Sequence, residues 1–130
     1  SPQRKMSKWK YFSTNELKCS HTGSCVMDEK FMEKLINVRE TVDVPFVITS
    51  GYRHPSHPVE SVKKSPGAHT TGHAVDILIR GGDAYRTILL AAAFGMTGIG
   101  VKQHGDSRFL HLDDLESTDE RPRPWVWSYK

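Results

Sequence analysis

The chain has 130 residues, a formal net charge of +3 at pH 7, 37% hydrophobic residues and 25% charged residues. This length and composition are typical of a globular protein and predict a single domain over residues 1–130 that buries its own core. No apolar run reaches the roughly 18 residues of a membrane span, and no basic run reaches about five residues. We therefore expect no membrane span and no nucleic-acid partner.

The first third of the chain contains signals for two helices after a short leading segment. Residues 1–11 are basic but include no apolar stretch, so we expect a flexible or extended segment and not a secretory signal. Ser13 and Glu16 have the spacing of a capping box, which predicts a short helix. Asp28 is a candidate N-cap for a longer helix that ends near Thr41. The apolar face of that helix is predicted from spacings of three and four residues between Phe31, Leu35, Val38 and Val42.

Two cysteines lie between these helices. Cys19 and Cys25 flank His21, and three interpretations stay open: a small metal clip, two free thiols, or a disulfide that closes a short loop. A structural zinc site needs four ligands, and no fourth ligand is near in the sequence.

The middle of the chain predicts two strands and a long loop. Residues 45–50 are apolar and β-branched, which indicates a buried strand. Residues 52–67 hold three prolines and many polar side chains, and a loop of this length is usually functional. Residues 74–79 predict a second buried strand, closed by a turn at Gly81 and Gly82.

The last third predicts one helix and three strands. Asp83 is a candidate N-cap for a largely apolar, well-buried helix from Ala84 to about Phe94, with Gly95 as its stop. Two short strands, 99–101 and 108–113, are expected to pair through a turn at 103–106, and a final strand would place three aromatic side chains on one side: Trp125, Trp127 and Tyr129. The mixture predicts an α+β fold with a central, mostly antiparallel sheet flanked by helices.

The candidate metal ligands are two histidines and one aspartate. His69 ends the long loop, Asp76 lies in the second strand, and Gly72 between them allows a tight turn. His111 lies in a later strand, where Asp113 faces the same side because side chains alternate along a strand. Two imidazoles and a carboxylate suit a catalytic zinc ion that keeps one position open.

A competing pair is His69 with His73, four residues apart as in the HExxH zinc proteases. The glutamate that those enzymes need after the first histidine is Thr70 here, and the Thr-Thr-Gly segment is a poor helix interior. We therefore expect Asp76, and not His73, to join His69.

Four motifs in combination resemble the zinc D-Ala-D-Ala carboxypeptidase family. Its members include bacterial wall carboxypeptidases and bacteriophage endolysins, and the hedgehog signalling domain shares its fold. The resemblance runs from about Phe12 to Tyr129, and the ending Arg121–Tyr129 is similar to phage- or prophage-encoded members. The motifs are Ser50-Gly51-Tyr52-Arg53, His69-x-x-Gly72-x-Ala74-x-Asp76, Gly98-Ile99-Gly100-Val101 and Phe109-x-His111-x-Asp113.

The resemblance implies a hedgehog/DD-peptidase-like fold with one zinc ion held by His69, Asp76 and His111. It also implies that Arg53 holds a substrate carboxylate or polarises the scissile carbonyl, with further substrate-binding positions at Ser50 and Tyr52. The implied activity is hydrolysis of a peptide bond in the peptidoglycan stem, of the D-Ala-D-Ala carboxypeptidase or the L-Ala-D-Glu endopeptidase type. The implied setting is a monomer, made in a host cytoplasm, that acts on the cell wall.

Two positions depart from the family pattern. Gly67 stands where many members have serine, and Arg108 stands where many have the acidic general base. Three candidates for the base stay open: Asp113, Asp106 and His104. Asp113 has a second possible role, the orientation of His111. The missing acid also keeps open a non-catalytic zinc-containing binding module, for example a phage virion or assembly component.

Overall fold

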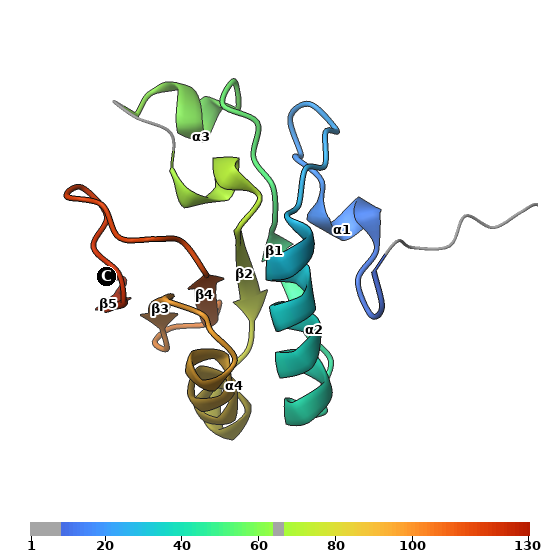
Figure 1. Ribbon diagram of the computed structural model, residues 1–130, viewed down its shortest axis with the longest axis vertical. Coiled ribbons are helices and arrows are strands. Elements are labelled where there is room, and N and C mark those ends of the chain that lie inside the picture. The colour runs from blue at the N-terminus through green and yellow to red at the C-terminus, as the bar shows by residue number, and fades with distance from the viewer. Residues whose placement is uncertain (1–8, 64–66) are drawn as a thin grey trace, which may run out of the picture.

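The computed structural model describes residues 9–63 and 67–130. The helices are α1 (Thr14–Leu17), α2 (Glu29–Val42), α3 (Pro58–Ser61) and α4 (Gly81–Ala93), with a short 3-10 helix, η1 (Ala68–Thr71). The strands are β1 (Val47–Ser50), β2 (Ala74–Leu78), β3 (Gly98–Lys102), β4 (Phe109–Asp113) and β5 (Trp125–Ser128). They form one sheet in the order β1-β2-β4-β3-β5 (Figure 1), antiparallel except for the β3–β5 pair. The predicted α+β class and mostly antiparallel sheet are confirmed.

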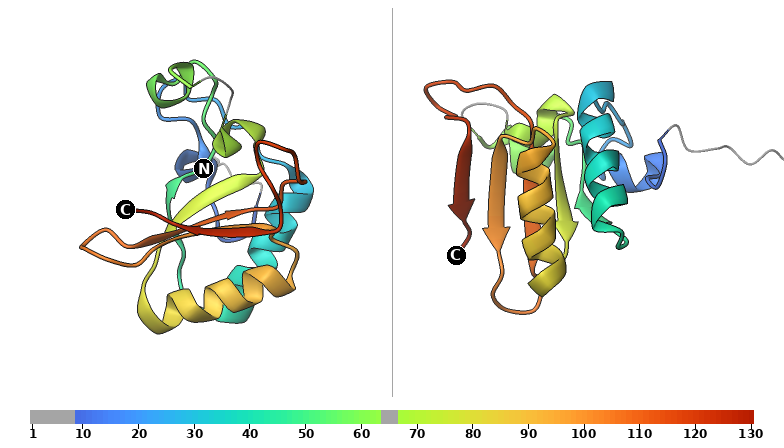
Figure 2. Two further views of the ribbon diagram at one scale, coloured as in Figure 1. Left: turned by 90° about the vertical axis from the view of Figure 1, so that its left-hand side faces the viewer. Right: turned by 60° about the horizontal axis from the view of Figure 1, so that its bottom comes forward.

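The two faces of the sheet have different coverings. Helices α2 and α4 lie against one face, and η1 and α3 lie beyond the other (Figure 2). Alternation along β2 and β4 turns Val75, Ile77, Leu110 and Leu112 into the core, where they join the apolar side of α2. The same alternation turns the polar residues of β2 and β4 to the face that α2 and α4 leave open.

The predicted N-terminal caps of the first two helices are confirmed. The Ser13 hydroxyl accepts from the Glu16 backbone N–H, and the Glu16 carboxylate accepts from the Ser13 N–H, which completes a capping box. The Asp28 carboxylate accepts from the Phe31 N–H at 2.9 Å and so caps α2.

Three expectations about the elements are wrong. Strand β1 lies at the edge of the sheet and is not buried, because only β2 pairs with it. Gly81 opens α4 and does not form a turn, and Arg80 is the N-cap, so that Asp83 lies inside the first turn. Much of the late apolar part of α4 is also exposed, with Leu89 60% accessible, since the helix contacts the core chiefly through one side that carries Ala84, Thr87 and Ala91.

The expected long loop between Tyr52 and Gly67 contains helix α3, and its residues 64–66 lie outside the described part. Of the leading segment 1–11, only residues 9–11 are described, and there Trp9 bridges to Phe12. Cys19 and Cys25 are free thiols, so the disulfide interpretation is wrong. Across residues 9–63 and 67–130, none of the helices has the length and apolar character to cross a membrane.

Candidate metal centre

One line of residues crosses all five strands on the open face of the sheet. Cα partners run from Ser50 to Asp76, then to His111, Gly100 and Trp127. Asp76 and His111 are therefore direct cross-strand neighbours, which brings their side chains together without any contribution from loops. His69 reaches the same place from η1, which immediately precedes β2.

The three predicted ligands converge. Asp76 Oδ1 lies 3.3 Å from His69 Nε2 and 3.2 Å from His111 Nδ1. One nitrogen or oxygen of each residue lies within 4.8 Å of the others, and all three side chains are largely buried. Three donors of this type at this separation match the protein part of a catalytic zinc site.

The outer ring nitrogens of the two histidines have partners that determine which nitrogen faces the centre. His69 Nδ1 donates to the Gly51 carbonyl oxygen at 2.8 Å, so the lone pair of Nε2 points to Asp76. His111 Nε2 lies 2.7 Å from Asp113 Oδ2, which leaves Nδ1 on the Asp76 side. Burial lowers the pKa of His111, but hydrogen bonds to Asp113 and Asp76 outweigh it and raise the pKa. The raised pKa means that His111 favours a proton on Nδ1, beside Asp76. A metal cation bound between Asp76 and His111 would replace this proton, so the donor set fits a metal ion.

Asp113 lies on the far side of the His111 ring from Asp76. Its side chain is fully buried, and Arg123 donates to both of its oxygens, from Nε at 2.9 Å and from Nη2 at 2.7 Å. Burial raises the pKa of Asp113, but His111 and Arg123 together hold it well below its usual range. This geometry favours orientation of His111 over proton transfer as the role of Asp113.

Two glycines of β3 make room for these side chains. A Cβ at Gly98 would collide with the Asp113 carboxylate and with Arg123 Nε. A Cβ at Gly100 would come within 2.7 Å of the Trp127 indole and 2.8 Å of the Tyr129 ring. The glycines of the Gly98-Ile99-Gly100-Val101 motif therefore serve close packing on the open face.

A cleft of about 390 Å³ opens over the three donors. Its walls carry three cationic and three aromatic side chains, and Asp76 is the one carboxylate among its described lining residues. The lining residues are Arg53, Lys63, Ala68, His69, Asp76, Phe109, His111, Arg123, Trp127 and Tyr129. The cleft is thus suited to a substrate that carries negative charge. Neither Asp106 nor His104 lines it, because both lie in the β3–β4 turn.

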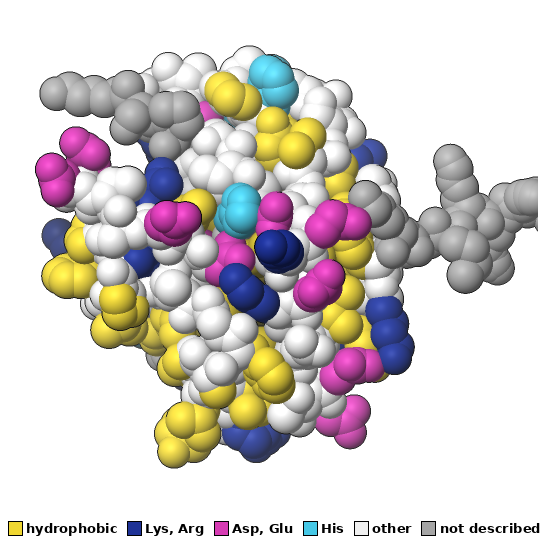
Figure 3. All heavy atoms as spheres, in the orientation of Figure 1, with side chains coloured by type: hydrophobic (Ala, Val, Ile, Leu, Met, Phe, Trp, Pro, Cys, Tyr) yellow, Lys and Arg dark blue, Asp and Glu magenta, His cyan; other side chains and the backbone are white. Residues whose placement is uncertain are grey.

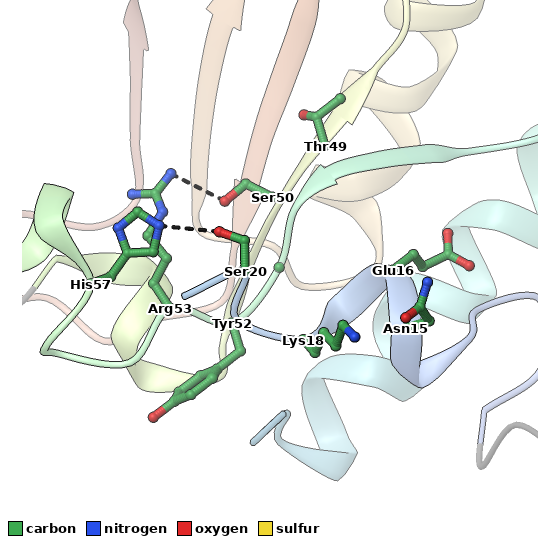
Figure 4. Close-up of a pocket in the computed structure, with 10 residues that line it drawn as sticks. Asn15, Glu16, Lys18, Ser20, Thr49, Ser50, Tyr52, Arg53 and His57 are labelled. Atoms are coloured by element: carbon green, nitrogen blue, oxygen red, sulfur yellow. Dashed lines mark hydrogen bonds between the residues drawn. The ribbon is translucent and has the colours of Figure 1, made fainter. Parts of the chain in front are cut away.

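Arg53 joins this cleft to a second pocket of about 210 Å³ beside β1 and α1 (Figure 4). Its Nη1 donates to Glu60 Oε2 at 2.9 Å and its Nη2 to Ser50 Oγ at 3.1 Å. Tyr52 is 8% exposed, and its ring points away from Ser50 and Arg53 in Figure 4. All three predicted substrate-binding residues line this second pocket; Ser50 and Arg53 are hydrogen-bonded to each other, and the Tyr52 ring also packs against the core.

A second group of possible metal donors lies outside this cleft. Asp28, His73 and Asp114 have ligand atoms within 4.8 Å of one another. Lys34 donates to Asp114 at 2.8 Å, and Asp28 caps α2, so these carboxylates already have partners. Figure 3 shows basic, acidic and histidine side chains interspersed on this face, between β2 and α2. His73 is separate from the first group, as the sequence predicts.

Glu60 holds Arg53 in place, and its buried carboxylate is expected to stabilise the fold. Its side chain is 1% exposed. Burial would raise its pKa, but hydrogen bonds from Arg53, the Gly67 N–H and Lys63 lower it from 4.5 to about 2. A depressed carboxyl pKa stabilises the fold above the unfolded value, and that stability disappears as the pH falls towards 2. At 1.36 kcal/mol per unit, the contribution at pH 7 is about 3 kcal/mol.

Glu60→Gln should therefore lower the free energy of unfolding by about 3 kcal/mol at pH 7. The loss should shrink between about pH 5 and pH 2, where the wild-type carboxylate gains its proton. Urea unfolding followed by circular dichroism at several pH values measures both effects. An equal loss of unfolding free energy at pH 7 and at pH 3 would show that the Glu60 carboxylate does not stabilise the fold through a lowered pKa.

Comparison with known proteins agrees with this geometry. The family model for peptidase M15 matches residues 10–113. No curated protein and no solved structure gives a significant match. The matched segment includes Arg53 and all three donors, whereas Arg123, Trp127 and Tyr129 follow it. These last residues, with Lys63 and Glu60, are the site residues that sequence reasoning missed. The one signal for them was the alternation that places Trp127 and Tyr129 on one side of a strand.

Proposed function

Because the chain belongs to the peptidase M15 family, we propose that it is a zinc-dependent metallopeptidase that hydrolyses a peptide bond in the peptidoglycan stem. The observation that carries the proposal is the convergence of His69 Nε2, Asp76 Oδ1 and His111 Nδ1 beneath a cleft. Membership of the family confirms the resemblance found in the sequence, whereas a phage-type origin and action on the cell wall stay proposals.

The chemistry divides between the metal ion and the side chains around it. A zinc ion held by these three residues would supply Lewis acidity and a bound water with a pKa near 7. Asp113 and Arg123 keep the His111 ring in the orientation that presents Nδ1. The Gly51 carbonyl does the same for His69. Ligand orientation by such partners commonly contributes 10- to 100-fold in metal affinity.

Arg53 is the residue that we propose to bind substrate charge. Its guanidinium lines the cleft, and Glu60 and Ser50 hold it from behind. A guanidinium positioned in this way can grip a carboxylate through two parallel hydrogen bonds. Both candidate bonds offer one: the free C-terminus of D-Ala-D-Ala, and the glutamate carboxyl group in L-Ala-D-Glu that does not form the amide to the next residue. Lys63 adds a second positive charge to the cleft.

A second candidate function is a non-catalytic zinc-containing binding module on the same fold. It is favoured by one observation: Arg108 occupies the place of the usual acidic base, and Asp76 is the one carboxylate that lines the described cleft. Such a module would bind stem peptides without cleaving them.

A digestion experiment separates the two candidates. The zinc-loaded protein is incubated with purified peptidoglycan, and the released fragments are identified by mass spectrometry. We expect new amino or carboxyl termini at one stem-peptide bond, loss of this activity with EDTA, and recovery when zinc is added back. Retention on peptidoglycan without any cleavage would instead establish the binding module and overturn the peptidase.

A further inference from the structure

Among its described lining residues, the cleft has no carboxylate besides the proposed ligand Asp76, but it has one phenol, that of Tyr129. Every Asp and Glu of the chain lies within the described residues 9–63 and 67–130. Of these, the described lining of the cleft includes Asp76 alone, which is a proposed metal ligand. Asp113 faces away from the centre and is paired with Arg123. Tyr129 is the one residue of this described lining whose side chain carries a hydroxyl group.

The position of Tyr129 follows from the sheet. Trp127 is the Cα partner of Gly100, and Tyr129 follows two residues later, so both side chains face the site. The centroid of the Tyr129 ring lies 5.0 Å from that of Phe109. The edge of the Tyr129 ring occupies the space next to Gly100 that a Cβ would need. Gly100 is in turn the Cα partner of His111. The phenol therefore lies over the strand adjacent to a proposed ligand, inside the cleft.

The neighbours of Tyr129 hold the ring there. Trp127 packs edge-on to it with a centroid distance of 6.4 Å and contacts the His111 ring at 5.1 Å. Burial raises the pKa of Tyr129 above its usual value. The hydroxyl therefore keeps its proton at neutral pH and acts as a hydrogen-bond donor.

We propose that Tyr129 is a catalytic residue whose hydroxyl donates a hydrogen bond to the oxygen of the scissile carbonyl. This inference rests on the proposed peptidase function and adds a residue to it. When hydroxide, which a zinc ion in the proposed site would supply near neutral pH, adds to the carbonyl carbon, a new carbon–oxygen bond forms, the C=O π bond opens and its electron pair moves to the carbonyl oxygen. The phenol O–H stabilises this charge and keeps its own proton. A donor aimed at the developing charge stabilises the transition state more than the ground state.

The test is Tyr129→Phe, with Tyr85→Phe as the matched control. Tyr85 lies on α4, is 69% exposed and takes no part in the cleft. Loss of one oxyanion donor typically reduces kcat by about 100-fold or more, and we expect this in Tyr129→Phe with KM changed less than about threefold. We also expect one bound zinc ion in both variants. Binding of phosphinate analogues of D-Ala-D-Ala and L-Ala-D-Glu, measured by calorimetry, should weaken about tenfold or more in Tyr129→Phe alone.

Each result has a defined meaning. Wild-type kcat and phosphinate affinity in Tyr129→Phe would overturn the role of Tyr129 and leave the peptidase standing. A loss of kcat that only follows a loss of zinc would assign Tyr129 to the wall of the site and also overturn the proposal. A wild-type protein that neither cleaves peptidoglycan nor binds either phosphinate would overturn the peptidase together with the role of Tyr129.

Discussion

Replacement of His111 by alanine is expected to remove the bound metal ion and with it all peptidase activity. Zinc bound by four ligands in small sites has an apparent binding free energy of about 10–16 kcal/mol, so one ligand contributes about 3 kcal/mol. The affinity for zinc should therefore fall by about 100- to 1000-fold. Calorimetric titration of the metal-free protein with zinc measures the change, and mass spectrometry of digested peptidoglycan measures the activity.

The matched control is His73→Ala. His73 lies four residues after His69 and pairs with Asp114 at 2.7 Å, but it is outside the proposed centre. We expect this variant to keep one zinc ion of wild-type affinity. Retention of zinc in His111→Ala and its loss in His73→Ala would move the metal to the group formed by Asp28, His73 and Asp114. It would also revive the interpretation in which His69 and His73 bind together.

The ligand set could be predicted because it depends on local rules. In a strand the side chains alternate, so Asp76 within an apolar run and His111 beside Asp113 each have a determined face once the strands are recognised. The register that makes Asp76 and His111 direct partners is a consequence of that burial pattern, because a shift by one residue would bury both polar side chains in the core.

The partners of these ligands could not be predicted in the same way. Arg123 lies ten residues beyond Asp113, and nothing in the spacing indicates that the chain returns to place its guanidinium on a buried carboxylate. Glu60 and Arg53 meet only because α3 forms within the expected loop. The prediction of where α4 begins was wrong for another reason. Gly81 and Gly82 indicate a turn by propensity, but the packing of α4 on α2 outweighs the cost of two glycines in a first turn.

Asp113→Asn is expected to destabilise the fold and to weaken metal binding at the same time. The Asp113 side chain is fully buried and that of Arg123 is 6% exposed, so the substitution leaves a buried guanidinium without its counter-charge. Breaking one partner of a buried pair costs about 3–5 kcal/mol of unfolding free energy. The amide also presents a different set of donors and acceptors to His111 Nε2, and loss of such an orienting partner weakens metal binding about 10- to 100-fold.

The two consequences can be measured apart. Chemical denaturation of the metal-free protein reports the loss of stability alone, and zinc titration of the folded protein at low temperature reports the affinity. Asp119→Asn, at an exposed position of the β4–β5 connection, is the control and should change neither quantity. A stable Asp113→Asn protein with normal zinc affinity but no hydrolysis would instead assign Asp113 to proton transfer. Such a result would overturn the orienting role that its contacts with His111 Nε2 and Arg123 support.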